Sequence, residues 1–163
     1  MSRSSGFTMI EMVVVLLLMT IIAATVLGRS ISTSDLDLNS ETDKIRNHLR
    51  FAQAEAMKRS DTVWGIKSAG TEYWLFRRDN PDNAANEVRL PGVVYSGASN
   101  RISESDIGVT LSDFTVFFNR IGKPYTAYTN EITNTPLASQ LTISVTVGET
   151  RSITITPETG LIR

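Results

Sequence analysis

Hydrophobic and polar positions divide the chain into three regions, and the first region is almost wholly apolar. Between Phe7 and Leu27 only four residues are polar, namely Thr8, Glu11, Thr20 and Thr25. As an α-helix this run would be about 32 Å long, at about 1.5 Å per residue, which is close to the apolar thickness of a bilayer. We therefore expect a transmembrane helix over residues 7–28, preceded by a leader over residues 1–6.

The second region, residues 29–60, has the spacing of an amphipathic helix. Ser40 and Asp43 resemble a capping box, with Asp in place of the usual Glu. An apolar stripe follows at intervals of three or four residues: Ile45, Leu49, Ala52 and Ala56. Gly28 is either a helix breaker between the two halves or an ordinary glycine at a helix crossing. A break near residues 30–40 stays open, and we favour one long, bent helix whose outer half packs on the rest of the chain.

The third region, residues 61–163, shows the alternation of β-strands. The candidate strands are Thr62–Lys67, Glu72–Arg77, Glu87–Tyr95, Phe114–Asn119, Leu141–Val147 and Arg151–Thr156. The last two form the best hairpin, because Gly148-Glu149 suits a two-residue turn with Gly first. The segments DNPDNAANE and SGASNRISESD are typical of exposed loops. The expected fold class is α+β, a long N-terminal helix packed on a C-terminal antiparallel β domain of two sheets.

Charge and cysteine content exclude several classes of protein. The 163 residues include 16 Lys and Arg and 17 Asp and Glu, a formal charge of −1, so the chain has no general attraction for nucleic acid or anionic lipid. The absence of cysteine rules out disulfides, thiol catalysis and zinc–thiolate sites. The apolar run is too long for a secretory signal, and no small-residue cleavage site follows Gly28. Arg3 favours a cytoplasmic leader, with the β domain outside the inner membrane.

A carboxylate inside the apolar run needs an explanation, because it costs about 2.5–3.5 kcal/mol at the centre of a membrane helix. The hexapeptide Gly6-Phe7-Thr8-Met9-Ile10-Glu11 resembles the GFTLIE signature of type IV pilins and type II secretion pseudopilins. The resemblance implies that a prepilin peptidase cuts between Gly6 and Phe7 and methylates the new amine of Phe7. It also implies that Glu11 pairs with the N-terminal amine of a neighbouring subunit, which favours alignment more than stability. The alternative is a glutamate that snorkels to the membrane surface.

Later segments resemble the GspH/FimT family of minor pseudopilins and minor pilins. The end of the long helix entering the first strand is resembled by the segment LRFAQAEAMKRSDTVWGI. The segment Phe117–Gly122 resembles a strand that ends in an F-x-x-x-G turn, and Ile153–Gly160 resembles the closing strand and its turn. The resemblance implies a pilin-like fold with residues 7–28 in a filament core. The implied partners are other pilin-like subunits contacted through the N-terminal helix, the prepilin peptidase, the inner-membrane assembly platform, and secreted substrate or the outer-membrane channel.

The residues offer no convincing catalytic or metal site, so we expect neither enzyme activity nor a cofactor. His48, the only histidine, is expected on the helix surface or facing the domain, and no G-x-S-x-G motif accompanies it. The acidic loop around Asp82 matches no calcium-loop spacing. The ending Gly160-Leu161-Ile162-Arg163 departs from the G-R-x-R motif of DNA-binding minor pilins, so nucleic acid is not expected as a partner.

Three functions are compatible with these features. The resemblance favours a minor pseudopilin of a type II secretion system, at or near the tip of a periplasmic pseudopilus, where it helps to initiate assembly and protein export. A minor pilin of a type IV pilus is the alternative, because it uses the same assembly chemistry. A bitopic membrane enzyme or solute-binding protein would instead keep Met1 and tolerate the loss of Glu11. Under the first two functions, the chain is a single-pass inner-membrane protein with a periplasmic C-terminal domain, and it assembles into a filament.

Overall fold

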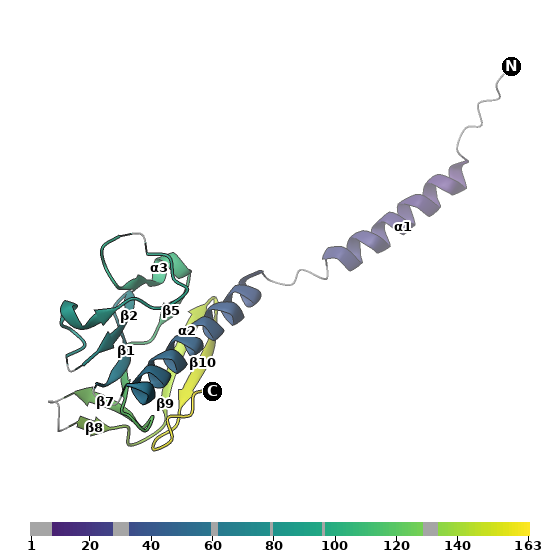
Figure 1. Ribbon diagram of the computed structural model, residues 1–163. Helices are drawn as coiled ribbons and strands as arrows, with labels where there is room; N and C mark the ends of the chain where they lie inside the picture. The colour runs from purple at the N-terminus through teal and green to yellow at the C-terminus, as the bar shows by residue number, and fades with distance from the viewer. Residues whose placement is uncertain (1–7, 28–32, 60–61, 79, 96, 129–133) are drawn as a thin grey trace. The chain divides into compact units, whose positions relative to one another are not determined.

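A computed structural model describes residues 8–27, 33–59, 62–78, 80–95, 97–128 and 134–163 (Figure 1). The chain divides into two compact units, residues 1–33 and residues 34–163. The first unit contains helix α1, Met9–Leu27. None of the described helices combines the length and the apolarity that crossing a membrane requires, so the transmembrane expectation for residues 7–28 stays a prediction.

The second unit is built on helix α2, Thr33–Lys58. Ser40 and Asp43, which resemble a capping box in sequence, do not mark a helix start, because residues from Thr33 are already helical and Asp43 accepts a hydrogen bond from Arg46 within the helix. Helix continuity through residues 28–32 lies outside the described residues. The predicted apolar stripe is confirmed, since all four of its residues are completely buried: Ile45, Leu49, Ala52 and Ala56.

Two antiparallel sheets pack with α2, as Figure 1 shows. The larger has the order β3-β2-β1-β6-β7-β8, with β4 also paired to β2. Its strands are β1 (Trp64–Ala69), β2 (Glu72–Arg77), β3 (Glu87–Val88), β4 (Ile102–Ser103), β6 (Phe114–Phe118), β7 (Pro124–Tyr128) and β8 (Asn134–Pro136). The smaller has the order β10-β9-β5, with β5 (Thr110–Leu111), β9 (Leu141–Val147) and β10 (Glu149–Ile155). The expected α+β fold with two sheets is confirmed.

The predicted strand Glu87–Tyr95 is wrong beyond Val88. Pro91 has no backbone N–H to donate, and Gly92 adopts a left-handed φ of 75°, so the segment leaves the sheet as a loop. The two segments predicted as loops also contain short helices, η1 (Ala84–Asn86) and α3 (Glu104–Ile107). Strands β2 and β9 have the predicted bounds.

The C-terminal hairpin is present, but its turn differs from the prediction. The ladder pairs Val147 with Glu149, so Gly148 alone lies between the paired residues, with a φ of 70°. The apolar pair Ile143 and Ile153 stands directly opposite across the two strands. The burial of this pair fixes the register, because a one-residue slip would turn one of the two side chains away from the core.

One hydrophobic core joins α2 to both sheets. Side chains from β1, β2 and β6 of the larger sheet and from β9 and β10 of the smaller sheet belong to the same buried cluster as the α2 stripe. The opposite face of the larger sheet carries a second cluster of Trp74, Phe76 and Phe117. Because β2 is covered on both faces, its residues 73–76 are buried without alternation.

Polar side chains of α2 fix the ends of loops against the helix. The Gln53 amide Nε2 donates to the carbonyl oxygens of Gly122, at 3.1 Å, and Gly160, at 3.0 Å. The Arg50 guanidinium donates to the carbonyl oxygen of Ile162 at 3.1 Å. These bonds join the β6–β7 turn and the C-terminal residues to one helix face. The backbone acceptors are thereby satisfied where no strand pairs with them.

A buried polar pair, His48 and Tyr73, lies between α2 and β2. The Tyr73 hydroxyl and His48 Nδ1 are 3.2 Å apart, and Tyr73 is 0% and His48 5% exposed. Burial, helped by the nearby Lys44 ammonium, lowers the pKa of His48 to about 4, although a hydrogen bond with the Pro91 backbone acts in the opposite direction. Burial also raises the pKa of Tyr73. Both groups are therefore neutral at pH 7, as a satisfied core pair should be.

We predict that Gly65→Ala destabilises the domain by about 2 kcal/mol or more, the scale of overpacking in a dense core. A methyl group at this position would lie 2.4 Å from both the Cβ of Phe117 and the carbonyl oxygen of Val116 on β6. Gly97→Ala is the control, because no atom lies within 4 Å of the added group there. Urea unfolding of purified chains would measure the difference, and equal stability of the two variants would contradict the packing described.

We also predict that stability falls as the pH falls from about 6.5 toward about 4. The unfolded chain binds a proton on His48 near pH 6.5, whereas the folded chain resists protonation until about pH 4. The full effect is about 3 kcal/mol, at about 1.4 kcal/mol per pKa unit. Urea midpoints between pH 7 and pH 5, above most carboxylate titration, should drop for the parent chain. In His48→Gln this drop in the urea midpoint should be much smaller. A drop as large as that of the parent chain would show that other groups cause it.

Candidate functional site

The processing site predicted from sequence, Gly6 and Phe7, lies outside the described residues, but Glu11 is placed in the first turn of α1. The backbone N–H of Glu11 donates to the side-chain Oγ1 of Thr8 at 3.4 Å and to its carbonyl oxygen at 3.1 Å. Thr8 and Glu11 thus occupy the first and last positions of a T-x-x-E capping pattern. The carboxylate near the helix N-terminus is also favoured by the helix dipole.

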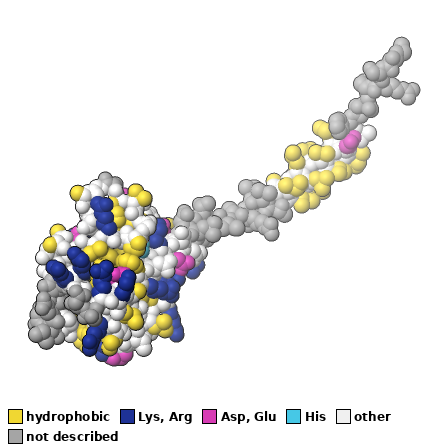
Figure 2. Space-filling view, viewed as in Figure 1, with side chains coloured by type: hydrophobic (Ala, Val, Ile, Leu, Met, Phe, Trp, Pro, Cys, Tyr) yellow, Lys and Arg dark blue, Asp and Glu magenta, His cyan; other side chains and the backbone are white. Residues whose placement is uncertain are grey.

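This capping pattern is a local role for Glu11 that sequence reasoning missed, although the T-x-x-E spacing was available to find it. It accounts for an acidic residue in the first turn but not for the apolar surface that follows. From Val13 to Ile22 the large apolar side chains are between 46% and 67% exposed, and Figure 2 shows them covering the visible side of α1. The Glu11 carboxylate forms no ion pair with any other described residue. Such a helix has an apolar surface that remains to be buried by lipid or by other helices.

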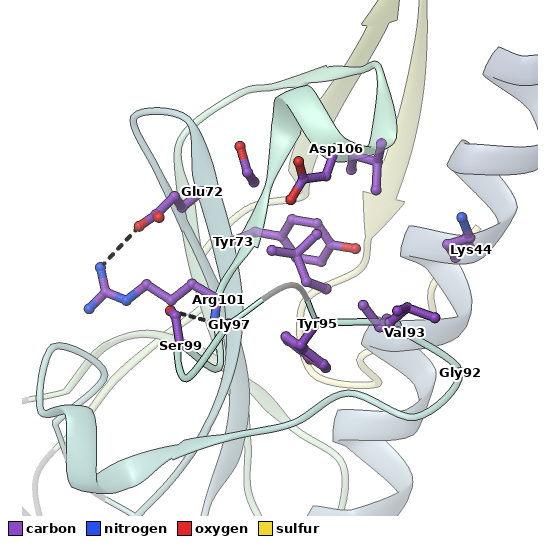
Figure 3. Close-up of a pocket in the computed structure, with 14 residues that line it drawn as sticks. Lys44, Glu72, Tyr73, Gly92, Val93, Tyr95, Gly97, Ser99, Arg101 and Asp106 are labelled. Carbon is purple, nitrogen blue, oxygen red and sulfur yellow. Dashed lines mark hydrogen bonds and ion pairs between the residues drawn. The ribbon is translucent and has the colours of Figure 1, made fainter.

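Figure 3 shows a hollow of about 440 Å³ in the β domain. The residue 92–101 loop forms one side, α3 another, and Lys44 on α2 closes the far end. Its apolar lining comes from Val93, Tyr95 and Ile107, and the side chain of Asp106 points toward the ring of Tyr73. Short β4 positions this wall, because its pairing with β2 brings Ile102 opposite Tyr73.

Arg101 at the edge of the hollow is neutralised by its neighbours. Its guanidinium is 2.7 Å from Glu87 and 3.5 Å from Glu72, and it lies 4.0 Å from the ring centre of Trp74. The hydrogen bond and the charge of Glu87 raise the pKa of Arg101. Arg101 therefore serves to hold β2, β3 and the following loop together. Its charge is therefore used within the domain rather than offered to an external anion.

Hydroxyl groups around the hollow hold the loop in place. The Tyr95 hydroxyl accepts from the backbone N–H of Leu90 at 2.7 Å, and burial raises its pKa. The Ser99 hydroxyl accepts from the backbone N–H of Arg101 at 3.1 Å. His48, the expected partner in any serine chemistry, is instead bonded to Tyr73 inside the core. The geometry therefore suits non-covalent binding rather than nucleophilic attack.

Acidic side chains in the described ranges do not converge on a cation. No group of three or more His, Asp or Glu residues there could hold a metal ion. Asp82 pairs with Lys67, and Glu87 with Arg101, so both are used in ion pairs. Asp79, considered with them at first, lies outside the described residues. Buried Glu104 accepts from the backbone N–H of Leu111 at 3.1 Å and so joins α3 to β5.

Comparison with known protein families matches two parts of the chain. Residues 1–27 match the prokaryotic N-terminal methylation motif, and residues 41–159 match the type II transport protein GspH family. No curated protein and no solved structure matches the chain. The second match covers most of α2 and nearly all of the β domain, including the core that joins them. The chain therefore belongs to the GspH family of pilin-like proteins and begins with an N-terminal methylation motif.

Proposed function

We propose that this protein is a minor pseudopilin of a type II secretion system, a structural subunit at or near the tip of a periplasmic pseudopilus. The observation that carries the proposal is the presence of a methylation motif and a GspH domain in one chain. The subunit helps to initiate assembly of the pseudopilus and thereby protein export. Membership of the GspH family supports a structural role for the chain.

Processing prepares the N-terminus for assembly. A prepilin peptidase cuts between Gly6 and Phe7 and methylates the amine of Phe7. The Glu11 carboxylate then pairs with the N-terminal amine of a neighbouring subunit inside the filament. An ion pair in a low-dielectric core forms well only in one register, because each unpaired charge is strongly destabilising there. Glu11 would thus select the axial position of the incoming subunit.

The apolar surface of α1 is suited to burial in two environments, one after the other. Before assembly it anchors the chain in the inner membrane, with the leader cytoplasmic and the C-terminal domain periplasmic. In the filament the same side chains pack against the helices of other pilin-like subunits. Both environments bury apolar groups that are more than 45% exposed in the isolated helix from Val13 to Ile22. The assembly platform of the inner membrane would move the helix from one environment to the other.

A minor pilin of a type IV pilus is the second candidate. The methylation motif at residues 1–27 favours it equally, because cleavage, methylation and helix packing are shared by both kinds of filament. The two candidates differ in the process that needs the subunit, because a pilus subunit acts in motility, adhesion or DNA uptake rather than in export.

We predict that Glu11→Ala leaves leader cleavage largely intact but lowers incorporation into the filament at least about tenfold, which corresponds to about 1.4 kcal/mol. Removal of one member of a buried ion pair leaves the other charge unpaired. Cleavage would be measured by mass spectrometry of the membrane fraction, and incorporation by cross-linking to neighbouring subunits. Glu11→Asp, which keeps the charge, should lose less. Normal incorporation of Glu11→Ala would refute the registration role.

A clean deletion strain would separate the two filament systems. We expect extracellular proteins to disappear from the culture supernatant while pilus-dependent motility and DNA uptake continue. The supernatant proteome and a motility assay on the same strain measure both outcomes. Intact export with lost motility or transformation would instead identify a pilus subunit.

A further inference from the structure

Exposed large apolar side chains are rare in the β-domain unit, and most of them gather at one end. Among the described residues of 34–163 only four such side chains are exposed: Met57, Val94, Ile121 and Leu161. Three of these, Met57 at 55%, Ile121 at 70% and Leu161 at 46% exposure, come from three segments that meet around Gln53. We call these three residues the end patch. Gathered exposed apolar groups of this kind mark interaction sites more often than scattered ones do.

The end patch lies beside a close backbone approach between Gly160 and Gly122. A Cβ added to Gly160 would lie 2.3 Å from the carbonyl oxygen of Gly122, and one added to Gly122 would lie 3.1 Å from the Sδ of Met57. Both glycines have left-handed φ angles, 61° and 78°, and Gln53 donates to both carbonyl oxygens. The patch therefore rests on a rigid base, which lowers the entropic cost of binding.

The charges around the end patch are predominantly positive. Seven charged residues adjoin its members or bond to their neighbours, and five are basic against two acidic, giving +3: Arg50, Lys58, Arg59, Arg120, Lys123, Glu55 and Glu158. The whole chain, by contrast, carries −1. Arg120 is exposed and has no ion-pair partner among the described residues. This surplus attracts acidic groups and repels an identical positive patch, which argues against pairing between two copies of the chain.

The patch also lies far along α2 from the point where the chain passes to α1. Met57 is 24 residues beyond Thr33, the first residue of α2, or about 36 Å at about 1.5 Å per residue. If α1 is used for anchoring and filament packing, as proposed above, this end of the domain is the one least constrained by that use.

We propose that the end patch is a docking site for a partner protein that presents an apolar side chain between acidic residues. The inference deepens the proposed function, because such a partner would contact the domain end opposite the helix linkage. Apolar contact supplies the buried centre of the interface, and Arg120 with its basic neighbours supplies the rim that selects an acidic partner.

The binding test uses the purified full chain in zwitterionic detergent, with labelled methionine, isoleucine and leucine methyl groups. The probes are the peptide Ac-Gly-Glu-Leu-Phe-Glu-Gly-NH2 and its twin with Lys in place of both Glu residues. We expect the acidic peptide to shift the methyl signals of Met57, Ile121 and Leu161. Its dissociation constant should be at least tenfold lower than that of the basic twin. Equal binding of the twins, or shifts only elsewhere, would overturn the proposal. Shifts produced instead by adding phosphatidylglycerol to phosphatidylcholine nanodiscs would identify a lipid surface and overturn it as well.

The cellular test compares full-length variants in the deletion strain. Ile121→Glu, which removes the apolar contact and also repels an acidic partner, should lower export at least tenfold. Ile121→Lys, which removes the apolar contact but keeps the positive charge of the rim, should lower export less. Asn47→Glu is the control for added negative charge, because Asn47 is exposed on α2 and belongs to neither the end patch nor the lining of the hollow. Leader cleavage and cross-linking to filament subunits should stay normal in all three. Equal export by the two Ile121 variants would overturn only the proposal that the end patch is a docking site. Normal export by the deletion strain would overturn the proposed secretion role itself.

Discussion

Burial of one face of α2 is the constraint on which the rest of the domain depends. The helix supplies side chains to a core that also receives residues from both sheets, so neither sheet has a complete core without it. Its apolar stripe includes Ala52 and Ala56, whose small side chains allow strands to approach the helix closely. Gln53 on the adjacent turn then fixes two loops by their carbonyl oxygens. The position of the C-terminal residues is consequently determined by the helix rather than by β10 alone.

Charged groups in the domain mostly serve to order loops rather than to create a long-range field. Arg101 joins β2 and β3 through Glu72 and Glu87, and Lys67 joins β1 to the η1 loop through Asp82. Pairs near the surface, such as Lys67 with Asp82, contribute about 0–1 kcal/mol each, so they select a loop conformation more than they stabilise the fold. Arg120 is one of several arginines without an ion pair among the described residues, and it differs from the others by its place beside the exposed apolar groups of the end patch.

Periodicity made part of this fold predictable. The α2 stripe and strand β9 each bury one face, so spacing alone identified them, and the clustered Tyr73–Phe76 run of β2 was apolar enough to be recognised. The sequence pattern did not identify strand β7, because the strand starts at Pro124 and contains little apolar alternation. Ser40 resembles a helix cap in sequence, but it lies inside a helix that begins at Thr33. The motif residues Gly6, Phe7 and Glu11 were visible in sequence, whereas the hollow and the end patch depend on contacts between distant segments, such as Gln53 with Gly160.

The two kinds of recognition proposed for this chain differ in their physics. An ion pair made by Glu11 inside a filament core would act in a low dielectric, where interaction is strong and salt has little influence. The basic rim around Ile121 faces water, where the same charges interact about tenfold more weakly and are screened within about 8 Å at physiological ionic strength. The first arrangement suits a contact made once and kept during assembly. The second suits a contact that forms and dissolves repeatedly, and apolar groups such as Met57 and Leu161 must then supply most of its affinity.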